Sequence, residues 1–425
     1  MRGFKELTPL DTAIRDALRY LKHAPRIVMS ELSQALGRYL AEDIVSPIDV
    51  PSFDRAVVDG YAVRSRDTFG ASPNNPVILR IRGLVRIGSP GWEREISEGE
   101  ALEIQTGAPM PRGADAVVMY ENTKRVDENT VEILRPVPPG GNISRRGEDV
   151  RAGERILSRG TRLAPWDLGV IASIGMARVK VYRPVVSIIC TGNELVEVSD
   201  IGEKGAGDIG SRGLVINSTR FAIEGLVVGM GFDAIYMGIV RDDIEKIYSM
   251  LLKAIERSDA VITIGGVSVG SSDSTLEAVK RLRPEYIVHG VAIRPGRPTS
   301  IAIAGGKPII MLSGFPVAAI TGFEALARPV LLNMVGGVEE PRPVIRGRLV
   351  RRVSTPINTR SFVRVRVYRR DDGEIYVDPL ALTGSGILST LVKGNGILVV
   401  PENREGFDEG EYVDVILLRP VESLQ

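Results

Sequence analysis

Short apolar runs rich in β-branched residues alternate with amphipathic segments over residues 183–336. The runs have the length of buried strands, and the segments between them repeat their apolar positions with the period of a helix. Such alternation predicts a doubly wound, mostly parallel sheet with helices on both faces. In chain order, we expect strands at 185–190, 233–240, 259–264, 286–293 and 307–312, and helices at 218–230, 242–257, 273–282 and 316–334.

The pattern differs on either side of this core. A helix is expected at 8–22, with Thr8 in position to cap it. Between about residues 50 and 180, apolar runs are broken by Gly and Pro pairs, which indicates β-rich structure with long loops. The chain after residue 337 is expected to form a small β-barrel or sandwich from strands at 344–353, 362–368, 375–377, 396–400 and 412–418. The fold class is therefore multidomain α/β plus β.

Composition limits the chemistry. The 425 residues carry 54 Lys+Arg against 53 Asp+Glu, a balance that argues against a polybasic nucleic-acid binder. One cysteine and two histidines provide neither an internal disulfide nor a soft-metal ligand set, so any metal should be a hard ion held by oxygen atoms. The N-terminus is charged and amphipathic, and no apolar run reaches the ~20 residues of a membrane span. We expect a cytoplasmic protein that binds no membrane; scarce glutamine also fits a thermophilic source.

A glycine-rich loop follows the strand expected at 259–264. Gly265 and Gly266 begin it, Ser268 and Gly270 continue it, and Asp273 stands at the start of the next helix. Glycines and hydroxyls just before a helix N-terminus form a phosphate cradle, because free N–H groups and the helix dipole both favour an anion. Asp273 is either the N-cap of that helix or a ligand of Mg²⁺ held against the same phosphates. The loop contains neither the Walker A motif nor a dinucleotide-binding fingerprint.

Two more loops follow predicted strands. Arg294 and Arg297 lie three residues apart in a loop whose backbone is restricted by two prolines and a glycine, which favours a clamp for bidentate anion recognition. The turn at 312–317 has Gly314 for close backbone approach and Pro316 to begin a helix.

Several other residues are ambiguous alone. Glu194 follows the first strand in a glycine turn that is equally a plain connection, and Asp59 lies in an ordinary Asp-Gly turn. Thr106 offers a hydroxyl in a constrained loop. Either Asp242 or Asp243 caps the helix at 242–257, which leaves the other free for chemistry.

The remaining chemistry-bearing side chains have structural explanations. Cys190 is interpreted as a small buried hydrophobe and His23 as a helix-surface residue. His289 either contacts a phosphate or is structural. The alternating arginines of 364–370 are interpreted as the solvated face of a strand.

Taken in chain order, these loops resemble the molybdopterin molybdenumtransferases, the family that includes the gephyrin E domain. The resemblance covers essentially the whole chain, and its ordered set of motifs is highly specific. The markers are Asp59-Gly60-Tyr61-Ala62, Thr106-Gly107-Ala108 with 111–115, Gly147-Glu148-Asp149, Thr191-Gly192-x-Glu194-Leu195, 265–270 with Asp273, and Pro295-Gly296-x-Pro298.

The resemblance implies an activity. The family inserts molybdate into adenylylated molybdopterin in a Mg²⁺-dependent step that hydrolyses the adenylate and releases AMP and molybdenum cofactor. It works as a homodimer with the site between protomers, and transient contact with the adenylyltransferase or with apo-molybdoenzymes is expected. Matched by motif, the catalytic positions are Asp59, Thr106, Glu194, Asp242 and Asp273, with Asp242 and Asp273 as Mg²⁺ ligands. Substrate would be bound by Gly265, Gly266, Ser268, Gly270, Arg294, Arg297, Ser313, Pro316 and Ser385; the two arginines fall where the family commonly has lysines.

The resemblance also implies four structural parts. We expect a discontinuous elongated dimerisation part at 1–50 and 141–182, an inserted β-rich domain at 51–140, an α/β molybdopterin-binding domain at 183–336 and a C-terminal β domain at 337–425.

The sequence departs from the family pattern in two places. The usual Leu-Pro-Gly-Asn-Pro turn has Ser313 and Phe315 in place of its first proline and its asparagine, and a frequent lysine is replaced by Gly290, beside His289. Both departures touch the expected substrate pocket and make tungstate an alternative to molybdate. The competing functions are an adenylyltransferase, which would lack these flanking β-rich parts, and a gephyrin-like scaffold, which would join a second enzymatic domain through a long linker.

Overall fold

The computed structural model describes residues 7–201, 209, 211–267, 273–381 and 384–423. The chain divides into two compact units. Unit 1 comprises the chain up to Ala41, Arg159–Ala164 and the chain from Val179 onward, and unit 2 comprises Glu42–Ser158 and Pro165–Arg178. The predicted four-part division is finer than this and stays a prediction.

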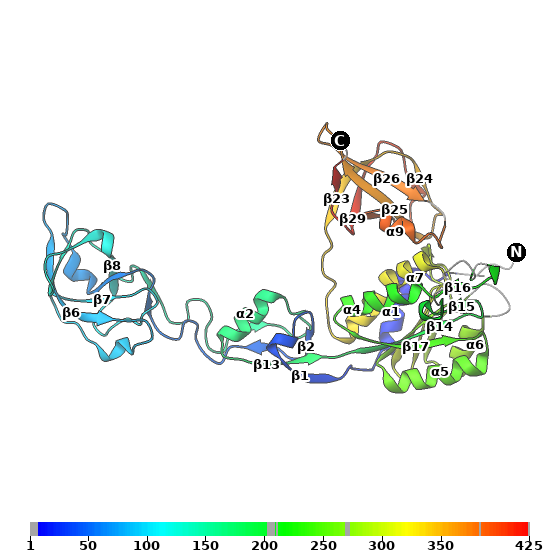
Figure 1. Cartoon of the computed structure of the whole chain (residues 1–425), viewed down its shortest axis with the longest axis horizontal. Helices are drawn as coiled ribbons and strands as arrows, with labels where there is room; N and C mark the ends of the chain where they lie inside the picture. Colours follow the sequence, from blue (N-terminus) through cyan, green and yellow to red (C-terminus); the bar gives the residue numbers. More distant parts are fainter. Residues whose placement is uncertain (1–6, 202–208, 210, 268–272, 382–383, 424–425) are drawn as a thin grey trace. The chain divides into compact units, whose positions relative to one another are not determined.

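A six-stranded sheet forms the centre of unit 1 (Figure 1). Its first four strands are parallel, whereas β21 is antiparallel to both of its neighbours. In spatial order the strands are β17 (Asp233–Val240), β14 (Val185–Thr191), β18 (Ala260–Ile264), β22 (Lys307–Leu312), β21 (Ser300–Ala304) and β19 (Tyr286–Val288). The mostly parallel sheet predicted from sequence is confirmed.

One part of that sheet differs from the prediction. The strand expected at 286–293 ends at Val288, because the chain turns at Gly290, whose φ of 85° lies in the left-handed region. It then returns as β21, which the sequence pattern did not reveal, and the Gly290 N–H donates to Ser300 Oγ at 3.0 Å. Two strands therefore replace the single long one.

Helices cover both faces of the sheet, as a doubly wound fold requires (Figure 1). One apolar core includes residues of α1 (Leu10–Tyr20), α4 (Thr219–Gly229), α7 (Pro316–Gly322) and α8 (Arg328–Met334). The other includes residues of α5 (Ile244–Arg257) and α6 (Ser274–Arg281). The expected helix at 316–334 is continuous through a π-helical turn at Phe323–Ala327, just before Pro329, whose missing N–H interrupts the α-helical ladder.

Among the described residues, the segment Pro316–Met334 is long and apolar enough to cross a membrane by length and composition. Its most apolar window is 61% buried inside the fold, and its side chains belong to the first core. Core packing therefore explains its composition.

The N-terminal helix begins later than expected. It starts at Leu10, and its N-cap position is Pro9, with no side-chain cap. The capping role predicted for Thr8 is wrong, because Thr8 forms a β-bridge with Val291: its N–H donates to the Gly290 carbonyl at 3.2 Å, and its carbonyl accepts from the Ala292 N–H at 2.9 Å.

The C-terminal part of unit 1 is a closed barrel rather than a sandwich. Its strands pair in the order β25 (Arg360–Arg369), β26 (Ile375–Ala381), β23 (Val344–Leu349), β29 (Tyr412–Leu417) and β27 (Gly396–Val400), and β27 pairs back onto β25. Inside it lie apolar side chains such as Val363, Val365 and Val415. The short helix α9 (Ser389–Lys393) and the strands β20 (Ile293–Arg294) and β30 (Glu422–Ser423) attach to β25.

Unit 2 is built around an open, half-barrel sheet, which confirms the β-rich prediction. The strand order is β8 (Ala116–Met119), β5 (Gly60–Val63), β7 (Glu100–Ile104), β6 (Val77–Val85), β10 (Thr130–Ile133) and β9 (Thr123–Arg125). Its remaining elements include β3 (Ile44–Val45), β4 (Arg55–Ala56), β11 (Ile143–Ser144), β12 (Arg155–Leu157) and α2 (Pro165–Ser173). Three short strands that, apart from Arg178, belong to unit 1 form a separate sheet: β1 (Ile27–Glu31), β13 (Arg178–Tyr182) and β2 (Tyr39–Leu40).

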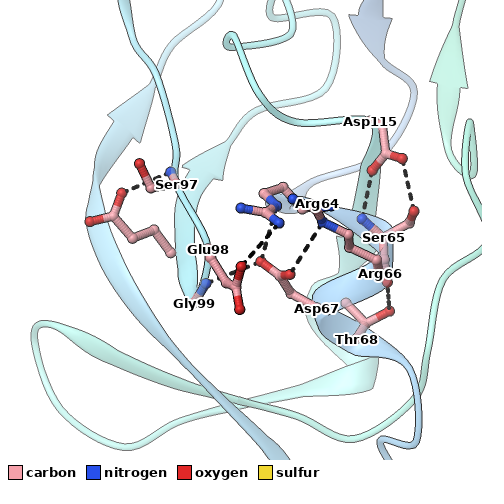
Figure 2. A network of polar contacts seen from close by, with 10 residues as sticks. Arg64, Ser65, Arg66, Asp67, Thr68, Ser97, Glu98, Gly99 and Asp115 are labelled. Carbon is pink, nitrogen blue, oxygen red and sulfur yellow. Dashed lines mark hydrogen bonds and ion pairs between the residues drawn. The ribbon is translucent and has the colours of Figure 1, made fainter.

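A polar network fixes the turn after β5 (Figure 2). Both carboxylate oxygens of Asp115 accept from Ser65, one from its N–H at 2.6 Å and one from its hydroxyl at 2.8 Å. Arg64 pairs with Asp67 at 3.5 Å, and the Asp67 carboxylate accepts from the Gly99 N–H at 3.1 Å. Asp115, part of a family marker, therefore has a structural role within unit 2.

Candidate functional site

A cavity of about 1210 Å³ lies at the carboxyl ends of the central parallel strands of unit 1. Its wall is formed by the turns that follow β14, β18 and β22. A two-stranded ribbon, β15 (Leu195–Val196) and β16 (Val215–Ile216), adds to this wall, as do Gly386 and Leu388 beside the barrel. This is the edge at which doubly wound sheets bind ligands.

The cavity brings together about half of the predicted site. Glu194, Asp242, Gly265, Gly266, Asp273, Ser313 and Pro316 line it. Ser268 and Gly270 lie outside the described residues. Arg294, Arg297 and Ser385 belong to unit 1 but are not on the described wall, and Asp59 and Thr106 belong to unit 2.

The two glycines after β18 are required by close backbone approach. Gly265 and Gly266 have φ of 95° and 63°. A Cβ on Gly265 would lie 2.3 Å from the Thr191 carbonyl oxygen, and one on Gly266 would lie 2.1 Å from Thr275 Oγ1. No side chain fits at either position, so backbone atoms form this part of the wall.

The two aspartates after β17 have different roles. Asp243 is the N-cap of α5, where its side chain accepts from the Lys246 N–H at 3.0 Å, and this hydrogen bond lowers the pKa of the Asp243 carboxyl. Asp242 lines the cavity, and a pair of 3.3 Å hydrogen bonds joins it to Asn193 at the end of the neighbouring strand β14. Asp243 therefore caps the helix, and Asp242 lies on the cavity wall.

The two carboxylate oxygens of Asp273 have different partners. Its Oδ1 accepts from the Leu276 N–H at 3.0 Å as the N-cap of α6, and its Oδ2 lies 3.2 Å from His289 Nε2. Asp273 is only 8% exposed, so this pair is largely shielded from water. His289 therefore contacts a site carboxylate.

A polar network anchors the β15–β16 ribbon. The Tyr236 hydroxyl on β17 donates to Glu197 just after β15 and accepts from Asn217 Nδ2 at 2.9 Å just after β16. Arg220 on α4 pairs with Glu197 at 3.3 Å, and its guanidinium carbon lies 3.8 Å from the centroid of the Tyr236 ring. Burial, followed by the hydrogen bond to Glu197, raises the pKa of Tyr236. The network holds the ribbon that follows Glu194.

Cys190 lies close to this network. It is fully buried, and burial is the main cause that raises the pKa of its thiol to about 11. The interpretation of Cys190 as a small buried residue fits this position, because a thiol that stays protonated is a poor nucleophile.

The charges on the cavity wall have one sign. Four carboxylates line it, those of Glu194, Asp242, Asp273 and Glu277, and no Lys or Arg is among the described residues of the wall. An anionic ligand could enter such a site only with cations that neutralise the carboxylates, or with arginines reaching in from outside the wall.

The two arginines predicted as a clamp, Arg294 and Arg297, do not line the described wall. Arg294 is half-buried and Arg297 exposed, and within the described part of the chain neither side chain makes a hydrogen bond or an ion pair. The following residue, Pro298, lines the cavity. The Ser385 carbonyl accepts from the Val317 N–H at 3.0 Å, which ties the loop that contains Gly386 to the start of α7.

Sequence reasoning missed a third arginine. Arg364 on β25 was assigned to a solvated face, but that is wrong: it is 3% exposed, because α9 covers this side of the strand. Its Nε donates to Thr390 Oγ1 at 3.3 Å, and one terminal nitrogen has no partner within the described residues. Burial lowers its pKa. A buried guanidinium without a carboxylate partner is energetically costly and indicates an anion ligand. The alternating sequence pattern gave no sign that α9 would cover Arg364.

In unit 2, the structure brings two predicted residues into contact. The Thr106 N–H donates to Asp59 Oδ1 at 2.7 Å, although they are 47 positions apart. Position 60, next to Asp59, requires glycine, because a Cβ there would lie 2.0 Å from the Val118 carbonyl oxygen of the paired strand β8. Both Asp59 and Thr106 are exposed.

Family models match almost the whole chain. They are described as the MoeA N-terminal region (domain I and II) over residues 8–175, a probable molybdopterin binding domain over 187–333, and the MoeA C-terminal region (domain IV) over 346–418. The molybdopterin molybdenumtransferase of Bacillus subtilis is 34% identical over 416 residues, 97% of this chain and 94% of that protein. The chain belongs to the molybdopterin molybdenumtransferase family.

Two further matches are also molybdopterin biosynthesis proteins. A putative molybdopterin biosynthesis protein of Methanocaldococcus jannaschii is 39% identical over 427 residues, which cover 99% of this chain and all of that protein. The crystal structure of a molybdopterin biosynthesis MoeA protein from Pyrococcus horikoshii matches with a TM-score of 0.81 and 33% identity, covering 97% of this chain and 100% of that one.

Membership confirms the resemblance seen in the sequence and defines the class of activity. The protein is an enzyme of the molybdopterin molybdenumtransferase type, with a role in molybdenum cofactor biosynthesis. The segment matched by the molybdopterin binding model contains β18, β22 and the C-terminal part of β14, and the ends of these strands form the cavity.

Proposed function

We propose that the protein inserts molybdate or tungstate into adenylylated molybdopterin. Water cleaves the phosphoanhydride of the adenylate, AMP leaves with one phosphate, and the molybdopterin keeps its own phosphate. The two dithiolene thiols of the molybdopterin then replace one oxide of the metal oxyanion, and that oxide leaves as water with the two thiol protons, which gives molybdenum or tungsten cofactor without a change of oxidation state. The observation that carries this proposal is the strand-end cavity, in which the backbone at Gly265 and Gly266 and carboxylates suited to a hard cation line the same wall.

The charge of the wall supports the need for Mg²⁺. The described residues include no cluster of three metal-ligating side chains, so an ion would complete its shell with substrate phosphate oxygens. Asp242 fits this role because it is exposed in the cavity and only weakly engaged by Asn193. Asp273 could join as a second ligand beside its contacts with the Leu276 N–H and His289, because each carboxylate oxygen can accept more than one contact. Magnesium, when bound, neutralises phosphate oxygens as the anhydride breaks.

The chain's own residues would do the rest. Glu194 is exposed at the wall, and within the described residues its carboxylate makes no hydrogen bond or ion pair, so we assign it the positioning of the attacking water. Gly265 and Gly266 let the phosphates approach the backbone. Arg294, Arg297 and Ser385 would contact the phosphates from the edge of the site, with Ser313 and Pro316 shaping its floor.

The oxyanion also needs a cation, and we assign Arg364 to it. Its guanidinium is buried, has no carboxylate partner among the described residues and lies beside Thr390, two residues after the wall residue Leu388. Molybdate and tungstate have the same shape and charge, so this contact does not choose between them.

We further propose a homodimer in which Asp59 and Thr106 act at the site of the partner protomer, together with transient contacts to the adenylyltransferase and apo-molybdoenzymes in the cytoplasm. The support for this is the family resemblance of the Asp59 and Thr106 motifs and their pairing in unit 2.

The test is a direct assay of the purified full-length protein. It is incubated with adenylylated molybdopterin, Mg²⁺ and either molybdate or tungstate, and AMP is measured over time. We expect AMP release that requires both the oxyanion and Mg²⁺. ATP-dependent adenylylation of molybdopterin would instead identify an adenylyltransferase, and absence of any turnover would favour a binding scaffold.

A further inference from the structure

Phe315 is an exposed aromatic side chain on the cavity wall. It is 61% exposed, and it is the only aromatic residue among the described residues that line the cavity. The family pattern has an asparagine at this place in the turn, so the side chain here has exchanged hydrogen-bonding capacity for an apolar ring. A large ring left half in solvent inside a concave site needs an explanation.

The backbone of Phe315 is fixed. Its N–H donates to Ser313 Oγ at 3.3 Å, and its carbonyl accepts from the Ala319 N–H at 2.9 Å at the start of α7. The ring is set close to Gly386, where an added Cβ would lie 3.2 Å from Cδ1. Glycine at 386 therefore leaves room for the ring, while most of the ring surface stays open.

The wall of the cavity has both apolar and acidic residues. Leu195, Val215 and Leu388 line it as Phe315 does, and so do Asp242 and the glycines Gly265 and Gly266. A ligand with both a flat ring and phosphates could use both kinds of residue. Aromatic side chains bind such rings by stacking, which needs only an exposed face.

We propose that Phe315 is a specificity-determining residue that stacks against a planar heteroaromatic ring of the substrate. The inference rests on the proposed function, in which the substrate has two such rings, the adenine and the pterin. It goes beyond that function because it assigns recognition of the ring to a residue that the family pattern does not supply.

The experiment measures binding to the full-length protein by calorimetry. The ligands are AMP, a simple pterin, and ribose 5-phosphate, which keeps the sugar phosphate of AMP without its ring. The variants are Phe315→Leu, which stays apolar but loses the ring, and Phe315→Tyr, which restores it. Phe69→Leu is the matched control, because Phe69 is a phenylalanine of similar exposure, 59%, that does not line the described cavity.

We expect Phe315→Leu to weaken binding of AMP or of the pterin by roughly 5- to 150-fold, the range for a base that loses its aromatic partner. Ribose 5-phosphate should change less than about twofold, since it makes no stacking contact. Phe315→Tyr and Phe69→Leu should bind like the unaltered protein. The ligand that loses affinity identifies which ring is stacked.

Three results would overturn the inference. The first is that Phe315→Leu binds AMP and the pterin with unchanged affinity, and the second is that the unaltered protein binds neither of them. The third is that AMP and ribose 5-phosphate lose affinity equally, which would mean that Phe315 only supports the loop at Gly386. The AMP-release assay separates this from a failure of the proposed function. Oxyanion-dependent AMP release with unchanged ring affinities in Phe315→Leu would reject the role of Phe315 alone, whereas absence of release from the unaltered protein would reject both.

Discussion

The cavity of unit 1 and the Asp59 turn of unit 2 both present acidic residues that belong to family motifs, but they use their carboxylates differently. In the cavity, Asp242 makes only 3.3 Å contacts with Asn193, and Glu194 is exposed on the same wall. In unit 2, the Asp59 carboxylate is engaged at 2.7 Å by the Thr106 N–H. We therefore expect the charge of the carboxylates to matter in the first region, and in the second the oxygen atom of Asp59 that accepts from the Thr106 N–H. Substitutions that remove charge but keep an oxygen should therefore separate the two regions.

The largest effect is expected at Asp242. Asp242→Asn keeps the size and one oxygen but removes the charge that we assign to Mg²⁺, so oxyanion-dependent AMP release should fall by about 10²- to 10³-fold. Chelation of Mg²⁺ from the unaltered enzyme should reduce the rate at least as far. The initial rate of AMP release measures both.

Asp243→Ala is the matched control for Asp242→Asn. Asp243 only caps α5, so its loss should lower the melting temperature by about 2–4 °C and leave the rate unchanged. A variant pair with the opposite behaviour, in which Asp243→Ala loses activity and Asp242→Asn does not, would reverse the assignment of the two aspartates.

Arg364 should have the next largest effect. Arg364→Gln keeps a hydrogen-bonding side chain of similar reach but loses the buried charge, so the molybdate concentration for half-maximal AMP release should rise about tenfold. Arg366→Gln, two residues along the strand, removes an arginine that is already paired with Glu422 and should leave that concentration unchanged. An equal response of the two variants would mean that Arg364 acts only on the stability of the barrel.

The comparison also explains which features could be predicted from sequence. The parallel strands and the glycine loop with Gly265 follow from local patterns, because buried runs and glycine turns are local, whereas the site roles of Glu194 and Asp273 were implied only by the family resemblance. The cover of Arg364 by α9 could not be predicted, because it depends on packing between elements far apart in the chain.

The contacts of His289 with Asp273 and of Asp59 with Thr106 are long-range in the same sense. The choice between Asp242 and Asp243 required the actual start of α5, since either residue type caps a helix equally well.

The Asp59 turn should respond to loss of an oxygen atom rather than of charge. Asp59→Ala removes the acceptor of the Thr106 N–H. If AMP release requires this loop to be ordered, loss of the one hydrogen bond should lower the rate of AMP release by about 2- to 12-fold. Asp59→Asn keeps an acceptor and should retain most of the rate. A fall in Asp59→Asn as large as in Asp242→Asn would show that unit 2 also supplies charge to the reaction, which would remove the distinction between the two regions.

The smallest effect is expected for Tyr236, which acts behind the cavity wall. Tyr236→Phe removes the hydroxyl that joins Glu197 to Asn217, and the free energy of unfolding at pH 8 should fall by about 0.5–1.5 kcal/mol. Because burial and the hydrogen bond to Glu197 raise the pKa of Tyr236 in the folded protein, its contribution is fully present below the unfolded pKa of about 10 and is lost as the pH rises above it. The difference in unfolding free energy between the two proteins, measured by denaturant titration, should therefore shrink between about pH 10 and pH 12. If it stays constant over that interval, the Tyr236 hydroxyl does not hold the β15–β16 ribbon through Glu197, and the stability difference arises from packing of the ring alone.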